Sequence, residues 1–125
     1  MAIGTDMVEI DRIAKAYSKQ GDKLVQRILT PSEIEKFEGL ANLQVKIGYL
    51  AKRWCVKEAV AKALGTGIAK GIGWQQMEVT NNKLGAPIMT LSGEAKARLN
   101  ILGGKNVLIS LSDERHYAIA FCTII

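Results

Sequence analysis

The chain has 125 residues, 48% of them hydrophobic, and its 17 lysines and arginines against 12 acidic residues give a formal charge of +5. This length predicts one small domain over residues 1–125. Together with the apolar content, it excludes a disordered tail and a multidomain enzyme with a separate nucleotide-binding fold. No stretch approaches the roughly 18 uninterrupted apolar residues of a membrane-spanning helix. The positive charge leaves nucleic acid, an anionic membrane, a phosphate-rich small molecule and an acidic protein as candidate partners.

The cysteines and the N-terminal residues bear on where the protein works. Cys55 and Cys122 form no CxxC or Cys/His metal-ligand spacing, and two cysteines are too few for a secreted disulfide scaffold. Residues 1–6 hold no basic region with a long apolar run, so we expect no signal peptide. These features predict a cytoplasmic protein in which both cysteines are core residues.

In the N-terminal half the pattern begins with a strand and continues with helices. Residues 2–10 form an apolar run that is typical of a buried strand, with Asp6 in its middle. Asp11 can cap a helix that ends near Gly21, since glycine is favoured just after a helix. Residues 30–33, Thr-Pro-Ser-Glu, predict a capping box with proline at the first helical position.

A long helix is predicted from Val45 to Leu64, and on a helical wheel it is apolar over most of its circumference. Such a helix is buried in the protein, and a partner subunit is a further source of burial. A narrow basic line between two apolar arcs holds Lys46, Arg53 and Lys57.

The C-terminal half has the pattern of strands. Segments 76–80 and 87–91 flank the turn sequence Asn-Asn-Lys-Leu-Gly and predict a hairpin with a turn longer than two residues. Ser92 can cap a helix over 93–102, and two strands are expected over 106–112 and 117–124. Helices early and hairpins late indicate an α+β fold with a mostly antiparallel sheet.

Glu58 and Lys62 fall inside one of the apolar arcs of the long helix. Their spacing of four residues is that of a surface ion pair with the glutamate on the N-terminal side, which is one interpretation. Charged groups are rare on an apolar helix face unless they are paired, bind a ligand or take part in catalysis. Both interpretations, a surface ion pair and a functional site, stay open for this pair.

Asp6 raises the same question, because aspartate is depleted in strands and this one lies in an apolar run. A turn or cap before the first helix is the alternative. Two buried acids, Asp6 and Glu58, are costly on separate elements unless a cation lies between them. Oxygen ligands alone point to Mg²⁺, which takes one or two carboxylates with waters and substrate phosphates. The segment Gly65-Thr66-Gly67 follows the helix. It is either a simple C-cap and turn, or a place where the absence of Cβ atoms lets a phosphate come close to the backbone.

Two blocks of sequence resemble the motifs of a known family. Residues 4–13, GTDMVEIDRI, resemble the N-terminal motif of the holo-[acyl-carrier-protein] synthases, which are 4′-phosphopantetheinyl transferases. Residues 53–68, RWCVKEAVAKALGTGI, resemble the second signature of that family, (F/W)xxKEAxxKAxGTG. The hairpin turn 82–87 and the ending Ser-Asp-Glu-Arg-His-Tyr-Ala extend the resemblance, to bacterial members with one domain, over nearly the whole chain.

The resemblance implies a 4′-phosphopantetheinyl transferase fold, with a small antiparallel sheet packed with a long central helix and shorter helices. It also implies a homotrimer with active sites shared between subunits. The implied reaction is a Mg²⁺-dependent transfer of 4′-phosphopantetheine from coenzyme A to a serine of apo acyl carrier protein. Adenosine 3′,5′-bisphosphate is released, and the product supports fatty acid biosynthesis. Neither nucleic acid nor a membrane is then needed as a partner.

By the same resemblance, Asp6 and Glu58 are the metal ligands, and Glu58 and Lys62 are the catalytic residues. Lys62 is expected to neutralise the transferring phosphate or to take part in proton movement. The acceptor of the serine proton stays open among Glu58, Lys62 and a metal-bound water. Arg53 suits the 3′-phosphate of coenzyme A. The full set of expected coenzyme A contacts is Arg53, Lys57, Lys62, Gly65, Thr66, Gly67 and His116.

One position departs from the pattern of the family. Many members carry a histidine near the nucleotide, directly after the last Ser-apolar-Ser/Thr, where this chain has Asp113. We do not transfer the role of that histidine to Asp113. The only histidine of the chain, His116, lies three residues further on, and an exposed turn residue is the alternative to a nucleotide contact.

The first helix is expected to dock the carrier protein, an acidic helical partner that the family binds through arginines on this helix. Arg12, Lys15 and Lys19 follow an i, i+3, i+7 spacing and line one face. Arg12 matches the motif position, whereas the two lysines are inferred from geometry alone. A solvated charged face is the alternative.

Two other functions compete with that of a transferase, and the sequence disfavours both. A small basic nucleic-acid-binding domain would explain the charge, but the chain has only 2 Phe, 3 Tyr and 2 Trp, with no RNA-binding aromatic strand and no zinc spacing. It also gives no reason for Asp6, Glu58 and Lys62 among apolar residues. A relative that kept the fold and lost the chemistry is disfavoured, because both acids and Lys62 are present.

Overall fold

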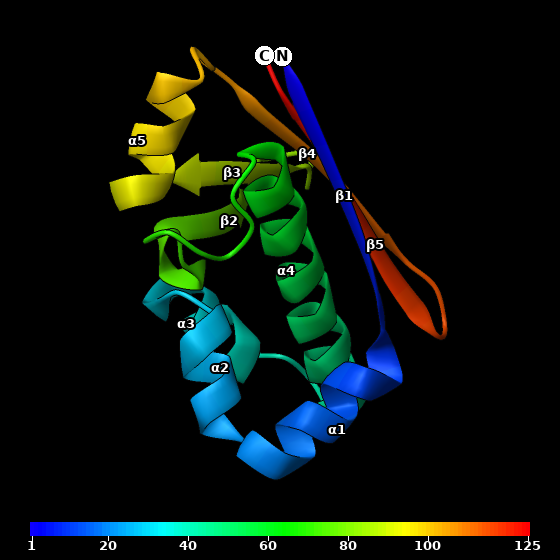
Figure 1. Ribbon diagram of the computed structural model, residues 1–125. Coiled ribbons are helices and arrows are strands. Elements are labelled where there is room, and N and C mark those ends of the chain that lie inside the picture. The colour runs from blue at the N-terminus through cyan, green and yellow to red at the C-terminus, as the bar shows by residue number, and fades with distance from the viewer.

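The computed structural model describes residues 1–125 as five α-helices and two small antiparallel sheets (Figure 1). The larger sheet has the strand order β1-β5-β4, and β1 pairs with β5 from Ala2–Ile124 to Glu9–Tyr117. The two ends of the chain therefore lie side by side (Figure 1). The strands of this sheet are β1 (Ala2–Glu9), β4 (Val107–Asp113) and β5 (Tyr117–Ile124).

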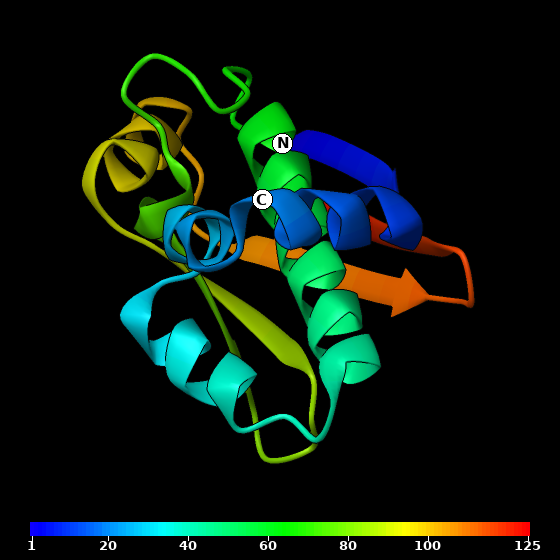
Figure 2. The same ribbon diagram turned by 90° about the horizontal axis from the view of Figure 1, so that it is seen from below.

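The long helix α4 (Leu43–Ala63) covers one face of the larger sheet. Seen from below, α4 runs between this sheet on one side and a hairpin with a helix on the other (Figure 2). The hairpin is formed by β2 (Met77–Asn81) and β3 (Pro87–Leu91), and the helix is α3 (Pro31–Glu38). Its most buried residues form the centre of the hydrophobic core, and they include Leu50, Ala51, Val56, Ala59 and Val60.

Gly4 allows β1 to lie directly against the backbone of α4. A Cβ atom at this position would collide with the carbonyl oxygen of Ala59 and would lie 2.7 Å from the amide nitrogen of Ala63. Because only glycine fits this contact, Gly4 sets the distance between the strand that carries Asp6 and the helix that carries Glu58 and Lys62.

The remaining elements lie around α4. α1 follows β1 without a loop, and Gly21, with φ of 55°, separates α1 from α2. A short 3₁₀ helix, η1, leads into the hairpin, and α5 follows the hairpin. The bounds are α1 (Ile10–Gln20), α2 (Asp22–Ile28), α3 (Pro31–Glu38), η1 (Trp74–Gln76), β2 (Met77–Asn81), β3 (Pro87–Leu91) and α5 (Gly93–Ile101).

The predicted α+β fold is confirmed, with the strand-first order, the long helix and the hairpin where they were expected. The capping box is also confirmed: the Thr30 side chain accepts from the Glu33 amide, and the Glu33 carboxylate accepts from the Thr30 amide. The long helix begins two residues earlier than predicted, because the Asn42 side chain caps it by accepting from Val45 N–H.

Two local predictions were wrong, and one helix was not predicted. Asp11 does not cap the first helix, because that helix begins at Ile10, whose N–H donates to the carbonyl of His116 at 2.8 Å. Ser92 precedes α5 but makes no side-chain cap. Helix α2 was not predicted, since its seven residues are too few to display a clear periodicity.

The outer face of the larger sheet carries a set of apolar side chains that no element of the chain covers. Alternation along the strands places Val8, Ala118 and Cys122 against α4 and the neighbouring side chains outward. No helix is both long enough and apolar enough to cross a membrane. The exposed residues of this outer face are Ile3, Met7, Leu108, Tyr117, Ile119 and Phe121.

Candidate active site

Asp6 lies in the middle of β1, with its side chain only 16% exposed. Its Oδ1 accepts a hydrogen bond from Lys62 Nζ at 2.9 Å, and the same ammonium donates to the carbonyl of Thr5 at 3.1 Å. Cys55 Sγ lies 3.6 Å from Oδ2. Asp6 is therefore part of the strand and faces α4, which rules out the alternative of a turn or cap residue.

Glu58 is half-buried on α4 and forms no ion pair and no hydrogen bond through its carboxylate. Burial raises the pKa of Glu58, the nearby charge of Asp6 raises it further, and Lys62 acts in the opposite direction. The i,i+4 ion pair between Glu58 and Lys62 does not form, because Lys62 binds Asp6 instead. The two acids are thus electrostatic neighbours with one lysine beside them.

This donor set fits Mg²⁺. The structure contains no group of three or more His, Cys, Asp or Glu side chains that could hold a metal ion. Mg²⁺ usually takes one or two carboxylates and keeps waters and substrate phosphates as its other ligands. Asp6 and an unpaired Glu58 on the adjacent element supply that number of carboxylates.

Lys57 does not belong to this site, and its predicted contact with coenzyme A is corrected by the structure. Its side chain is fully buried, and Nζ donates to Glu33 Oε1 at 2.6 Å and to the carbonyls of Ile28 and Trp74 at 2.7 and 3.2 Å. An ammonium has three donors, so none is left for a phosphate. Burial lowers the pKa of Lys57, whereas the Glu33 carboxylate raises it.

Glu33 has a structural role that goes beyond the capping box predicted from the sequence. Besides Lys57 and the Thr30 amide, its carboxylate accepts from the Val79 amide at 2.8 Å. It therefore joins α3, α4 and β2 beneath the surface. The capping-box pattern could not reveal this role, because both partners beyond Thr30 come from distant parts of the chain.

Arg53 lies at a different place from the two acids. Five residues separate Arg53 from Glu58, so their side chains point about 140° apart around the helix. Arg53 lines a cavity of about 610 Å³ together with Lys36 and Lys52, and Asp113 lies on the same wall, 3.9 Å from Lys52. Three cations against one carboxylate make this cavity suited to an anionic ligand.

The segment Gly65-Thr66-Gly67 follows α4, which ends at Ala63 with Leu64 as its C-cap. The amides of Thr66 and Gly67 both donate to the carbonyl of Ala61, at 3.3 and 3.0 Å. Gly65 and Gly67 have φ values of 86° and 65°, which favour glycine. The C-cap is therefore present, and a Cβ atom at Gly67 would have no atom within 4 Å.

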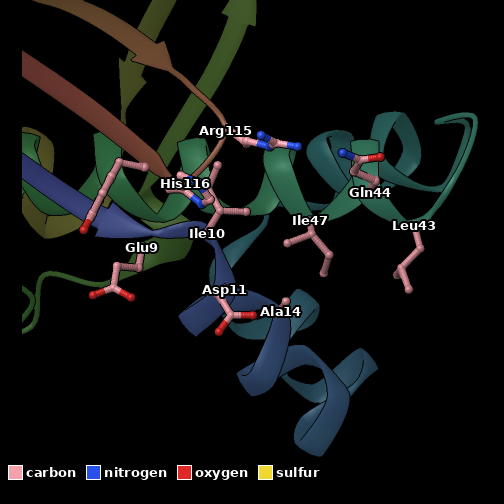
Figure 3. Close-up of a pocket in the computed structure, with 10 residues that line it drawn as sticks. Glu9, Ile10, Asp11, Ala14, Leu43, Gln44, Ile47, Arg115 and His116 are labelled. Atoms are coloured by element: carbon pink, nitrogen blue, oxygen red, sulfur yellow. The ribbon is translucent and has the colours of Figure 1, made fainter.

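His116 is exposed and lies about 13 Å along the strand direction from Asp6, beyond Glu9 at the end of β1. It lines a second cavity, of about 620 Å³, between the β4–β5 turn, the start of α1 and the start of α4 (Figure 3). Asp11 and Ile47 come from those helices and face the same space (Figure 3). His116 is therefore not brought together with Asp6 and Glu58.

The basic residues of α1 are all exposed. Arg12 and Lys19 have no acidic partner, whereas Lys15 Nζ lies 3.0 Å from Asp11 Oδ2. The face that was expected to dock a carrier protein is thus free, with part of the charge of Lys15 compensated.

The two cysteines are buried and free, as predicted for core residues. Burial is the main cause that raises the pKa of the Cys55 thiol to about 12, with Asp6 as the next cause. Burial alone raises that of Cys122 to about 11. Neither thiol is a nucleophile near neutral pH.

Comparison with known proteins identifies the family. Residues 2–122 match the family described as the 4′-phosphopantetheinyl transferase superfamily. The chain is 50% identical to a protein of Vibrio campbellii, over 96% of this chain and 93% of that protein. It is 48% identical to one of Shewanella amazonensis, over 96% and 94% respectively. Both relatives are named holo-[acyl-carrier-protein] synthase.

Solved structures agree with this match. Holo-[acyl-carrier-protein] synthase from Neisseria meningitidis superimposes with a TM-score of 0.91 at 35% identity, covering 99% of this chain and 97% of that one. The enzyme from Helicobacter pylori, solved in complex with coenzyme A, gives 0.84 at 30% identity, covering 98% and 99%. The chain belongs to the 4′-phosphopantetheinyl transferase superfamily. Within that superfamily it is an enzyme of the holo-[acyl-carrier-protein] synthase group.

Proposed function

We propose that the protein transfers 4′-phosphopantetheine from coenzyme A to a serine of apo acyl carrier protein. The serine hydroxyl gives its proton to a base of the site or to water, and its oxygen forms a bond to the β-phosphorus of coenzyme A. The pyrophosphate P–O bond breaks, and adenosine 3′,5′-bisphosphate leaves. The observation that supports this most is the group formed by Asp6, Lys62 and the unpaired Glu58. Such a reaction needs charge neutralisation and positioning more than a covalent nucleophile.

In this proposal Asp6 and Glu58 hold Mg²⁺. When bound, the ion would neutralise charge on the pyrophosphate and on the leaving phosphate. Lys62 holds Asp6 in place through Nζ, and its half-exposed ammonium adds a positive charge where the transferring phosphate would lie. The turn after α4 has open space at Gly67, where the arm of coenzyme A would pass.

We further propose a homotrimer in which two subunits build each site. Arg53, with its cavity, would hold the 3′-phosphate of coenzyme A, yet it points away from the Asp6–Glu58 side of its own α4. A neighbouring subunit can supply the second half. The uncovered apolar face of the larger sheet supports such an association, because soluble proteins rarely leave a contiguous apolar patch exposed.

The carrier protein would dock on α1. The exposed Arg12, Lys15 and Lys19 suit an acidic helical partner through electrostatic steering. We expect Arg12→Glu to raise the KM for the carrier about tenfold while kcat changes much less. Lys83→Glu, at the exposed hairpin turn, is the control for net charge. An unchanged KM in steady-state assays with the carrier varied would remove α1 from the docking surface.

A cytoplasmic location and a role in fatty acid biosynthesis complete the proposal. Both cysteines are reduced and buried, which suits a reducing compartment. The transfer of the arm would supply the holo carrier on which acyl chains are built.

The test is to incubate the protein with coenzyme A, Mg²⁺ and an apo acyl carrier protein and to weigh the carrier by mass spectrometry. We expect an increase by one phosphopantetheine group and an equal amount of adenosine 3′,5′-bisphosphate. A carrier whose acceptor serine is replaced by alanine is the control. A folded enzyme that leaves the carrier mass unchanged would refute the proposed activity.

The metal assignment makes a separate prediction. Asp6→Asn and Glu58→Gln should each lower kcat at least about 100-fold, because each removes one of two carboxylate ligands. Added Mg²⁺ with coenzyme A should raise the melting temperature of the unaltered protein but not of these variants. Asp22→Asn, at an exposed acid of α2, should keep the thermal shift. A full shift in Asp6→Asn and Glu58→Gln would overturn the ligand assignment.

A further inference from the structure

Arg53 is a buried cation whose bonding is incomplete. Its side chain is only 5% exposed, and its Nε is the one buried side-chain polar atom of the structure without a hydrogen-bond partner. The nearest acid is Glu33, whose Oε2 lies 4.0 Å from that nitrogen, too far for a hydrogen bond. The Glu33 carboxylate already accepts from Lys57 and from the amides of Thr30 and Val79.

Tyr49 holds the guanidinium of Arg53 from one side. It lies one helical turn before Arg53, and the centre of the guanidinium is 4.4 Å from the centroid of its ring. The ring is itself fixed, because it packs on Phe37 with centroids 6.3 Å apart and its hydroxyl lies 3.4 Å from the carbonyl of Glu33. An aromatic face under a guanidinium leaves the N–H edge of the group free.

We propose that Tyr49 is a positioning residue for coenzyme A, because its ring orients Arg53 so that the guanidinium edge is available to the 3′-phosphate in the basic cavity. This inference rests on the proposed function, in which Arg53 holds that phosphate. Glu33 accepts its hydrogen bond from Lys57 at 2.6 Å and lies 4.0 Å from Arg53 Nε, so it leaves that N–H without a hydrogen bond. Lys36 and Lys52 add to the positive charge of the same cavity.

The test compares two donors, coenzyme A and 3′-dephospho-coenzyme A, which lacks the phosphate in question. Tyr49→Leu should raise the KM for coenzyme A about fivefold, since it removes the aromatic face beneath the cation. The KM for 3′-dephospho-coenzyme A and kcat with either donor should change less than twofold. Tyr49→Phe keeps the ring without the hydroxyl and should restore the ratio of the two KM values.

A double-mutant cycle separates positioning from a general loss of packing. In an Arg53→Ala background, Tyr49→Leu should not change the ratio of KM values any further. Tyr49→Met serves as a second variant without a ring if Tyr49→Leu does not give a folded protein, as judged by its thermal transition. KM does not depend on the amount of active enzyme, so partial unfolding does not imitate the expected result.

The outcomes are distinct. An equal rise in both KM values for Tyr49→Leu, or a ratio that Tyr49→Phe does not restore, would overturn the positioning role of Tyr49. Failure of the unaltered protein to modify the carrier with either donor would instead refute the proposed function. A normal transfer reaction with no preference for coenzyme A over its dephospho form would refute the assignment of Arg53 to the 3′-phosphate, and the inference with it.

Discussion

Lys57 and Lys62 lie five residues apart on α4, one in the core and the other at the surface. Lys57 is fully buried between α2, α3 and η1, whereas the side chain of Lys62 is half exposed and reaches the strand that carries Asp6. A helical wheel gives the direction of each side chain but not the element that covers it. For this reason the sequence identified Asp6, Glu58 and Lys62 as an unusual group but placed Lys57 wrongly beside a ligand.

The two lysines should respond differently to the same substitution. Lys57→Met should lower the free energy of unfolding by about 3–5 kcal/mol, because it leaves the Glu33 carboxylate buried without its cation. Lys62→Met, which breaks a partly exposed pair, should cost less than about 1 kcal/mol while lowering turnover. Urea unfolding and the transfer assay measure the two effects. A stable Lys57→Met protein with a raised KM for coenzyme A would restore the original assignment.

Among the elements, the contact between β1 and α4 does most to build the site. Asp6 belongs to the strand, while Cys55, Glu58 and Lys62 belong to the helix, and the two backbones meet at Gly4. Patterns within short segments predicted both elements, since each has a strong periodicity or a capping signal. The pairing of β1 with β5 could not be predicted in this way, because it joins residues more than 100 positions apart and no local pattern encodes it.

Gly4→Ala should therefore disturb stability and the site together. The added methyl group would collide with the backbone of Ala59, which cannot move without moving α4. We expect a loss of about 1–3 kcal/mol or more, as for overpacked cores, and a weaker response to Mg²⁺. Gly73→Ala is the matched control, because its φ is −133° and no atom lies within 4 Å of the new methyl group. Equal stability of the two variants would show that β1 can shift.

For the whole molecule, the open feature is the outer face of the larger sheet, with Ile3, Met7, Ile119 and Phe121 uncovered. One side of this sheet forms the core with α4, and no helix or strand of the same chain covers the other side. The sequence indicated extra burial through the long helix, which is apolar over most of its circumference. It could not show which surface is involved, because exposure depends on how all the strands are ordered.

Charge placed on this face should dissociate the assembly. Phe121→Glu should convert a trimer to a monomer in light scattering coupled to size-exclusion chromatography, because a carboxylate is costly to bury at an apolar interface. Leu84→Glu, at a hairpin residue that is 95% exposed, should leave the mass unchanged. A monomeric unaltered protein would refute the trimer.

Mixing two inactive variants tests whether two subunits share each active site. Mixed, refolded copies of Asp6→Asn and Arg53→Ala should regain about a quarter of the sites, as random 1:1 mixing in a closed ring gives. No recovery in mixed trimers would place both residues in a site within one subunit.

The position of β1 in the sheet also bears on how the enzyme matures during translation. β5 is the only strand that β1 pairs with, and Ala2 is joined to Ile124. The strand β1 therefore gains its only partner strand more than 100 residues after its own synthesis. Contacts of such long sequence separation form slowly. A ribosome-bound chain stalled before residue 117 would thus hold Asp6 on a strand that has no partner in the sheet.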